Sequence, residues 1–140
     1  MTTKKYLLQL RTIDLEIAMS QSEAQSWRDL ATKMHHEPSD IRVDTSPAPD
    51  KMESLVVKAA DCACEADRQR DILLYTKMTI EKQIKGLENS FYRGLLWGYY
   101  HDSKSTGELA KYVNYTGRHI ERLLVKAEKD FECEYGSEYL

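Results

Sequence analysis

Apolar and small residues recur at alternating steps of three and four along the first part of the chain. From residue 3 to residue 34 there is neither Gly nor Pro, and the repeat runs through Tyr6, Leu10, Ile13, Ile17, Ser20, Ala24, Trp27, Ala31 and Met34. This is the spacing of a coiled-coil seam on one long helix. Such a helix, of about 32 residues, would be about 48 Å long. Because it is too long to be buried within so small a domain, we expect it to pack lengthwise against another helix.

A second segment repeats the pattern from Lys51 to about Lys85. Its seam positions are Met52, Leu55, Ala59, Cys62, Ala66, Gln69, Leu73, Thr76, Ile80, Gln83 and Leu87. Both segments are rich in small residues near the middle, so the two helices can approach closely if they are antiparallel. All three prolines lie between the segments, which predicts a loop at about 36–50. Residues 1–87 are therefore expected to form a helical hairpin.

The apolar stripe of the second helix is wider than a single seam requires. Val56, Ala63, Leu74 and Ile84 extend it to one side. An apolar face that the hairpin itself does not cover favours association with a second copy. The pattern therefore predicts a homo-oligomer, a dimer or higher.

The remaining chain predicts three short helices. The first, at about 91–101, has Phe91, Leu95, Leu96 and Tyr99 on one side. After a polar turn, Ser105 and Glu108 have the spacing of a capping box, which starts a helix that buries Leu109, Ala110 and Val113. Asn114 can adopt the left-handed conformation that a tight turn needs. Thr116 is a suitable N-cap for the helix that follows.

The last helix has two distinct faces. Its apolar residues Ile120, Leu123, Leu124, Ala127 and Phe131 lie within a narrow arc at 100° per residue, which leaves Arg118, Arg122, Val125, Lys126 and Lys129 pointing away. Residues 88–131 are therefore predicted to form a helix-turn-helix module. Residues 132–140 form an acidic tail, a candidate for disorder that could screen the basic helix.

The composition supports helices and limits the kind of nucleic-acid binding. With only 6 Gly and 3 Pro, and 31% charged residues, breakers are too scarce for a many-stranded β fold, so we expect an all-α protein. The net charge of -3 argues against a generally basic coat for nucleic acid. Residues 90–140 carry seven Lys/Arg and eight Asp/Glu, so a single module should bind weakly. Oligomerisation would then supply affinity through multivalency.

The outward face of the last helix carries side chains suited to double-stranded DNA. Arg118 and Arg122 are one turn apart, and Arg is well shaped to bridge the N7 and O6 acceptors of guanine in the major groove. Thr116 and the free amides of the first turn suit a phosphate, and Gly117 allows a close backbone approach. Glu121 can accept from a cytosine amino group or pair with nearby cations. Further phosphate contacts are expected from Lys126, Lys129, Lys104 and Arg93. The plainer alternative is a solvated basic face on a surface helix.

Other kinds of site find little support in the sequence. His35, His36, Cys62 and Cys64 lack the spacing of a metal site, and the two cysteines are better explained as small packing residues. With three cysteines in all, a disulfide framework is not expected. Neither a phosphate-binding loop nor a nucleophile-base arrangement is visible, so we expect no cofactor and no enzymatic activity. The absence of a long apolar run or a signal-like start predicts a cytoplasmic protein without a membrane partner.

The C-terminal motifs resemble a known family. The matching positions are Tyr92-Arg93, Leu95-Leu96, Tyr100, Lys104-Ser105, Leu109-Ala110, Val113-Asn114-Tyr115-Thr116 and Arg118-His119-Ile120 with Arg122. They resemble the helix-turn-helix of sigma-70 region 4 and, more closely, the phage and prophage late-gene regulators of the ArpU and RinA type. The first 85 residues match only in architecture. The resemblance implies a transcriptional regulator that works with RNA polymerase, and it adds His119 to the expected DNA-binding residues.

The leading hypothesis is thus an oligomeric, sequence-specific transcriptional regulator. A phage small terminase subunit, which also joins such a module to oligomerising helices, is a second DNA-binding hypothesis. A coiled-coil adaptor for RNA polymerase, with no DNA binding of its own, is the alternative from another class. Ring assembly on a packaging site would favour the terminase, and salt-insensitive binding to a protein alone would favour the adaptor.

Overall fold

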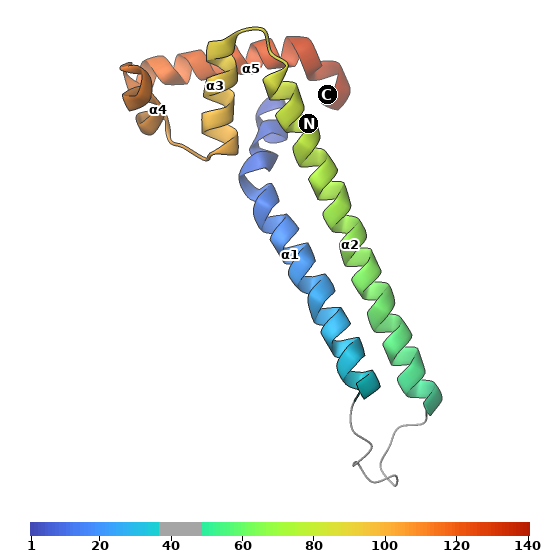
Figure 1. The fold of residues 1–140 in the computed structure, drawn as a ribbon. Helices are drawn as coiled ribbons and strands as arrows, with labels where there is room; N and C mark the ends of the chain where they lie inside the picture. The colour runs from blue at the N-terminus through green and yellow to red at the C-terminus, as the bar shows by residue number, and fades with distance from the viewer. Residues whose placement is uncertain (37–48) are drawn as a thin grey trace. The chain divides into compact units, whose positions relative to one another are not determined.

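The computed structural model describes residues 1–36 and 49–140, and each regular element in these ranges is a helix (Figure 1). The all-α fold class is therefore confirmed. The predicted loop at about 36–50 falls mainly on 37–48, outside the described residues. The elements are α1 (Thr3–His36), α2 (Pro49–Lys85), α3 (Ser90–Leu96), a π-helical turn η2 (Trp97–His101), α4 (Thr106–Val113) and α5 (Gly117–Tyr139).

The described chain divides into two compact units. Unit 1 comprises Met1–Asp14 and Tyr75–Leu140, and unit 2 comprises Leu15–Leu74. Both long helices contribute to both units, so the first turns of α1 and the last turns of α2 belong with the C-terminal helices. The division at residue 87 into an oligomerisation part and a DNA-binding part is a functional one, and it stays a prediction.

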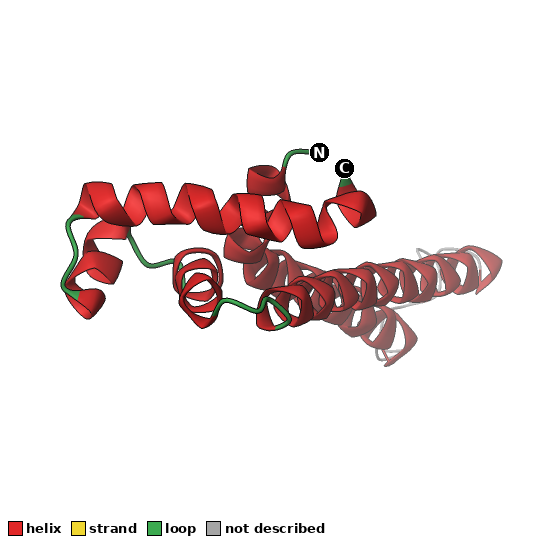
Figure 2. Cartoon of the chain, turned by 90° about the horizontal axis from the view of Figure 1, so that it is seen from above, coloured by secondary structure: helices red, strands yellow, loops and turns green. Residues whose placement is uncertain are grey.

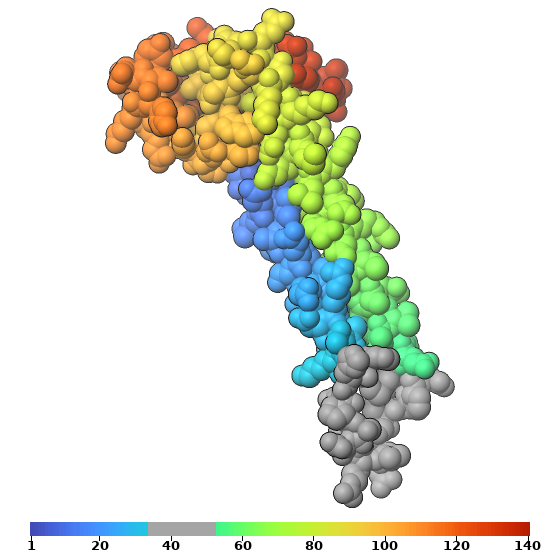
Figure 3. Space-filling view, viewed as in Figure 1, coloured from blue at the N-terminus to red at the C-terminus, as the bar shows by residue number. Residues whose placement is uncertain are grey.

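Unit 2 is a pair of helices held together by small side chains. Ala24 on α1 and Ala59, Ala63 and Ala66 on α2 are all buried. An ion pair between Arg28 and Asp67 joins the two helices. Small buried residues allow helix backbones to approach closely, as the sequence pattern predicted. In the space-filling view the two helices lie against each other without an open gap (Figure 3).

The predicted seam holds along α1 but needs correction on α2. Leu55 and Gln69 are exposed, as is Cys64, so these three are not the packing residues they were expected to be. The buried row on α2 steps through Ala59, Ala63 and Ala66, and Cys64, the residue after Ala63, points away from this row. Of the seam positions, Met34 and Met52 lie outside the residues whose side chains are described.

In unit 1 the ends of the two long helices run antiparallel. The hydroxyl of Tyr6 donates to Oε1 of Gln83 at 2.7 Å, whereas Asp14, farther along α1, pairs with Lys77, which lies earlier on α2. Between them Leu7, Leu10 and Ile13 are buried together with Ile80 and Ile84. This end of the helix pair is thus apolar inside and tied by polar contacts at its edges.

The turn η2 changes which tyrosine enters the core. The amide of Asp102 donates to the carbonyl of Trp97 at 3.0 Å, five residues back, which adds one residue to that turn. As a result Tyr100 is fully buried, while Tyr99, which regular helical spacing predicts to face inward, is only half-buried. Leu96, Ile120, Ala127 and Phe131 are likewise fully buried in the C-terminal part of unit 1. Figure 2 shows α3 and α4 on one side of the long α5.

The acidic tail is not disordered, because α5 continues to Tyr139. The ring of Tyr139 stacks on that of Tyr6 with 4.1 Å between centroids, and its hydroxyl lies 2.8 Å from Oγ1 of Thr3. Glu138 accepts a hydrogen bond from the amide of Gln83. The aromatic residues of this segment therefore fix its last turns against α1 and α2.

Candidate nucleic-acid interface

The turn between α4 and α5 has the conformation that the sequence predicts. Oγ of Ser105 accepts from the amide of Glu108 at 3.2 Å and caps α4. Asn114 ends α4 in the left-handed region, with φ 59° and ψ 37°. Two residues later Oγ1 of Thr116 accepts from the amide of His119 at 3.2 Å and caps α5. The two helices are thus separated by a short turn whose direction is set by local contacts.

The two faces of α5 are separated as expected. Ile120, Leu124, Ala127 and Phe131 are buried, and Leu123 is half-buried. On the other side the exposed residues are Arg118, Glu121, Arg122, Val125, Lys126 and Lys129. The basic side chains are therefore free to meet a ligand, although their role in DNA binding stays a prediction.

The first turn of α5 is open at its N-terminal end. Thr116 is exposed, and a Cβ added to Gly117 would meet no heavy atom within 4 Å. The amides of Gly117 and Arg118 have no carbonyl one turn earlier in the helix, as at any helix start. His119 is exposed, and its ring packs edge-on against Tyr115 with 4.8 Å between centroids. This end of the helix is open to solvent, and phosphate binding there stays a prediction.

Of the two acidic residues beside the basic face, one points into the protein. The carboxylate of Glu128 accepts a hydrogen bond from the hydroxyl of Tyr100. Burial raises the pKa of Tyr100 well above its ordinary value, and the hydrogen bond and negative charge of Glu128 raise that pKa further. Glu121 is exposed among the cations. Of these two carboxylates, only that of Glu121 is therefore fully exposed beside the basic side chains.

The structure does not bring Arg93 and Lys104 to that face. Arg93 lies on α3, and Lys104 lies just before α4 with its Nζ 4.8 Å from the ring centroid of Tyr112. Both are half-buried and line one groove. The other predicted residues, Thr116, Gly117, Arg118, His119, Glu121, Arg122, Lys126 and Lys129, follow one another from the cap of α5 along its first four turns.

Sequence reasoning missed exposed residues on α4 and in the turn. Tyr112 is 80% exposed and Tyr115 is 47% exposed, and Lys111 is exposed as well. Each carries a hydrogen-bond donor of a kind that contacts phosphate in protein–DNA interfaces. Helical spacing contains the signal, because inward Leu109 and Ala110 leave the following two residues on the outside.

Among the residues that the structure describes, none of the helices combines the length and the apolar character needed to cross a bilayer. Comparison of the chain with protein-family models, with curated proteins and with solved structures finds no match in any of the three.

Proposed function

We propose that this protein is a sequence-specific DNA-binding transcriptional regulator that inserts α5 into the major groove. The observation that carries the proposal is the capped α4–turn–α5 unit, with Arg118 and Arg122 exposed on the face opposite buried Ile120 and Leu124. Two guanidinium groups one turn apart can each bridge the N7 and O6 atoms of a guanine. A regulator of phage or prophage late genes, working with RNA polymerase, fits both this arrangement and the sequence motifs.

Lys126 and Lys129 have a different role in this proposal. They lie farther along the same face, where the backbone of a bound duplex would pass. Contacts of lysine with phosphate add affinity without reading sequence. The cap of α5 at Thr116 would hold a second phosphate at the other end of the contact.

The experiment begins with sequences selected from random double-stranded DNA by the full-length protein. Replacing Arg118 and Arg122 together by Ala should lower affinity for the selected sequence by at least tenfold, since each bidentate contact contributes about 1–3 kcal/mol. The matched control is Lys33→Ala with Lys58→Ala, which removes the same charge from exposed sites on α1 and α2. Equal binding by the two double variants would contradict the proposal.

We propose further that the protein acts as a homo-oligomer. Leu15 and Met19, one turn apart on α1, are 67% and 64% exposed, and adjacent exposed apolar side chains are typical of an association surface. Linking two weakly binding modules would raise the affinity for paired sites. Leu15→Ser with Met19→Ser should lower the mass measured by light scattering and weaken DNA binding. An unchanged mass would rule out this surface.

An adaptor that binds a protein through the long helices is the second candidate. It is favoured by Tyr75 and Met78 on α2, which are 73% and 67% exposed and lie on one face of the helix. Such an adaptor would bind RNA polymerase with little dependence on salt and would select no sequence from random DNA. The same selection experiment therefore separates the two candidates.

A further inference from the structure

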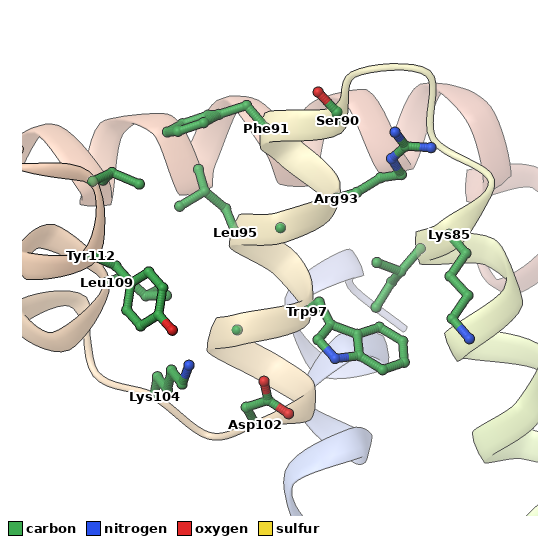
Figure 4. Close-up of a pocket in the computed structure, with 14 residues that line it drawn as sticks. Lys85, Ser90, Phe91, Arg93, Leu95, Trp97, Asp102, Lys104, Leu109 and Tyr112 are labelled. Atoms are coloured by element: carbon green, nitrogen blue, oxygen red, sulfur yellow. The ribbon is translucent and has the colours of Figure 1, made fainter.

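A groove in unit 1, of about 710 Å³, runs over α3 and η2 and is a candidate site for a second ligand (Figure 4). Trp97 and Lys85 flank it on one side, and Leu109, Tyr112 and Lys104 lie on the other. This volume is within the range of about 300–1,000 Å³ typical of small-molecule sites. The groove lies apart from the basic face of α5.

No side chain covers the floor of the groove at two positions, because two glycines lie one turn apart on the same helix face. Gly94 and Gly98 both line it. A Cβ on Gly98 would lie 2.7 Å from Cδ2 of Leu109, so this glycine allows α4 to approach. A Cβ on Gly94 would meet nothing within 4 Å. The space above Gly94 is therefore open, although no packing contact requires a glycine there.

The wall formed by Trp97 is aromatic, and its ring is held in place by two neighbours. The ring of Trp97 stacks on that of His101, with 3.9 Å between centroids and 17° between planes. Nζ of Lys85 lies 5.1 Å from the Trp97 centroid. Flat rings that are already oriented favour a flat ligand, because little side-chain entropy is lost when it binds.

The groove is also cationic in a protein whose net charge is -3. Lys85, Arg93 and Lys104 line it against the single carboxylate of Asp102. Within the described ranges no carboxylate lies within 4.0 Å of the charged nitrogens of these three cations. Asp102 itself is paired with Nδ1 of His101 at 2.9 Å. The positive charges are thus available to an anion that enters the groove.

We propose that this groove binds a small organic anion with an aromatic or similarly flat apolar body. The body would lie over Gly94 against Trp97, and the carboxylate, sulfonate or phosphate group would meet Arg93 and Lys85. Apolar contact supplies affinity and the cations select the charge. The proposal goes beyond DNA binding and uses none of the residues on α5, so either can fail without the other.

The test uses anilinonaphthalene sulfonate, an anionic aromatic probe whose fluorescence rises in apolar surroundings, and full-length protein carrying Trp27→Phe. Trp97 is then the only tryptophan, and energy transfer from it to the probe reports binding in the neighbourhood of this groove, which the variants below assign. We expect saturable binding of one probe per chain. Gly94→Leu should fill the floor and weaken binding by about tenfold or more. The control Cys133→Leu, which adds the same side chain at an exposed position of α5 outside the groove, should leave binding unchanged.

The charge requirement is tested separately, which keeps the proposal falsifiable should Gly94→Leu disturb the fold. Lys85→Gln with Arg93→Gln should weaken the anionic probe about three- to tenfold, as expected for loss of two partly solvated charges. Binding of the neutral analogue N-phenyl-naphthylamine should not change. Non-saturable probe binding, or equal effects of the charge change on both probes, would overturn the proposal and leave the groove to a larger partner such as an acidic protein segment.

Discussion

The hydroxyl of Tyr100, buried beneath α5, donates a hydrogen bond to the carboxylate of Glu128. This contact joins η2 to the middle of α5, where Glu128 lies between the exposed Lys126 and Lys129. It also keeps a negative charge directed inward on the helix that we propose to bind DNA. The Tyr100–Glu128 pair therefore both supports the basic face of α5 and directs one carboxylate away from it.

The Tyr100–Glu128 pair predicts a loss of stability in alkali. Burial, with Glu128 adding to it, raises the pKa of Tyr100 in the folded protein. The resulting stabilisation is complete below the unfolded pKa of about 10 and is lost as pH rises through the higher folded pKa. Tyr100→Phe should therefore lower the free energy of unfolding by about 1–3 kcal/mol at pH 7. Above pH 10, the free energy of unfolding of this variant should fall less steeply than that of the parent protein.

Urea denaturation at a series of pH values measures this effect. Some alkaline loss should remain in Tyr100→Phe, because burial also raises the pKa of Tyr6 and of Tyr139. In Glu128→Gln the acceptor is kept but the charge is removed, so Tyr100 should ionise at lower pH, as followed by tyrosinate absorbance. Parallel pH profiles for Tyr100→Phe and the parent protein would contradict the assignment.

At position 114, in the turn before α5, we expect glycine to be tolerated unusually well. Asn114 has φ 59°, a conformation that β-branched residues strongly disfavour. Asn114→Val should lower the free energy of unfolding by about 1–2 kcal/mol, whereas Asn114→Gly should have little effect. Thermal denaturation of the two variants provides the comparison. A Val variant as stable as the Gly variant would show that the left-handed turn is not required.

Close packing of the long helices predicts a strong dependence on side-chain size. Ala63 is 2% exposed in the pair formed by α1 and α2, whereas nearby Ala60 is exposed. Ala63→Leu should lower the free energy of unfolding by about 1–3 kcal/mol through overpacking. Ala60→Leu, the matched control, should change it by less than about 0.5 kcal/mol. Equal effects of the two leucines would mean that the helices do not pack through this face.

The sequence was most informative where structure depends on neighbouring residues. The caps at Ser105 and Thr116 and the turn at Asn114 follow from short side chains that bond to nearby amides, and all three were predicted. Burial of Tyr100 was not, because the extra residue of η2 breaks the helical spacing on which the prediction rests. The helical tail was missed because stacking of Tyr139 on Tyr6 is a long-range contact, which outweighs the acidic composition.

In the candidate site, too, only the features that depend on local spacing could be predicted from the sequence. The outward position of Arg118 and Arg122 follows from their spacing relative to Ile120 and Leu124. In contrast, nothing local in the sequence indicates that Arg93 and Lys104 share a groove with Trp97, since residues from α3, from η2 and from the segment before α4 meet there. Contacts between elements require the three-dimensional structure, even in a chain with such regular patterns.

Protection of guanine N7 from methylation by dimethyl sulfate tests the central claim most directly, because N7 is exposed only in the major groove. On a duplex selected from random DNA, the parent protein should protect discrete guanines, and Arg118→Ala should lose protection at one of them while Lys129→Ala keeps the pattern at higher protein concentration. A bound complex with no N7 protection, or with protection unchanged in both Arg118→Ala and Arg122→Ala, would contradict insertion of α5 into the major groove.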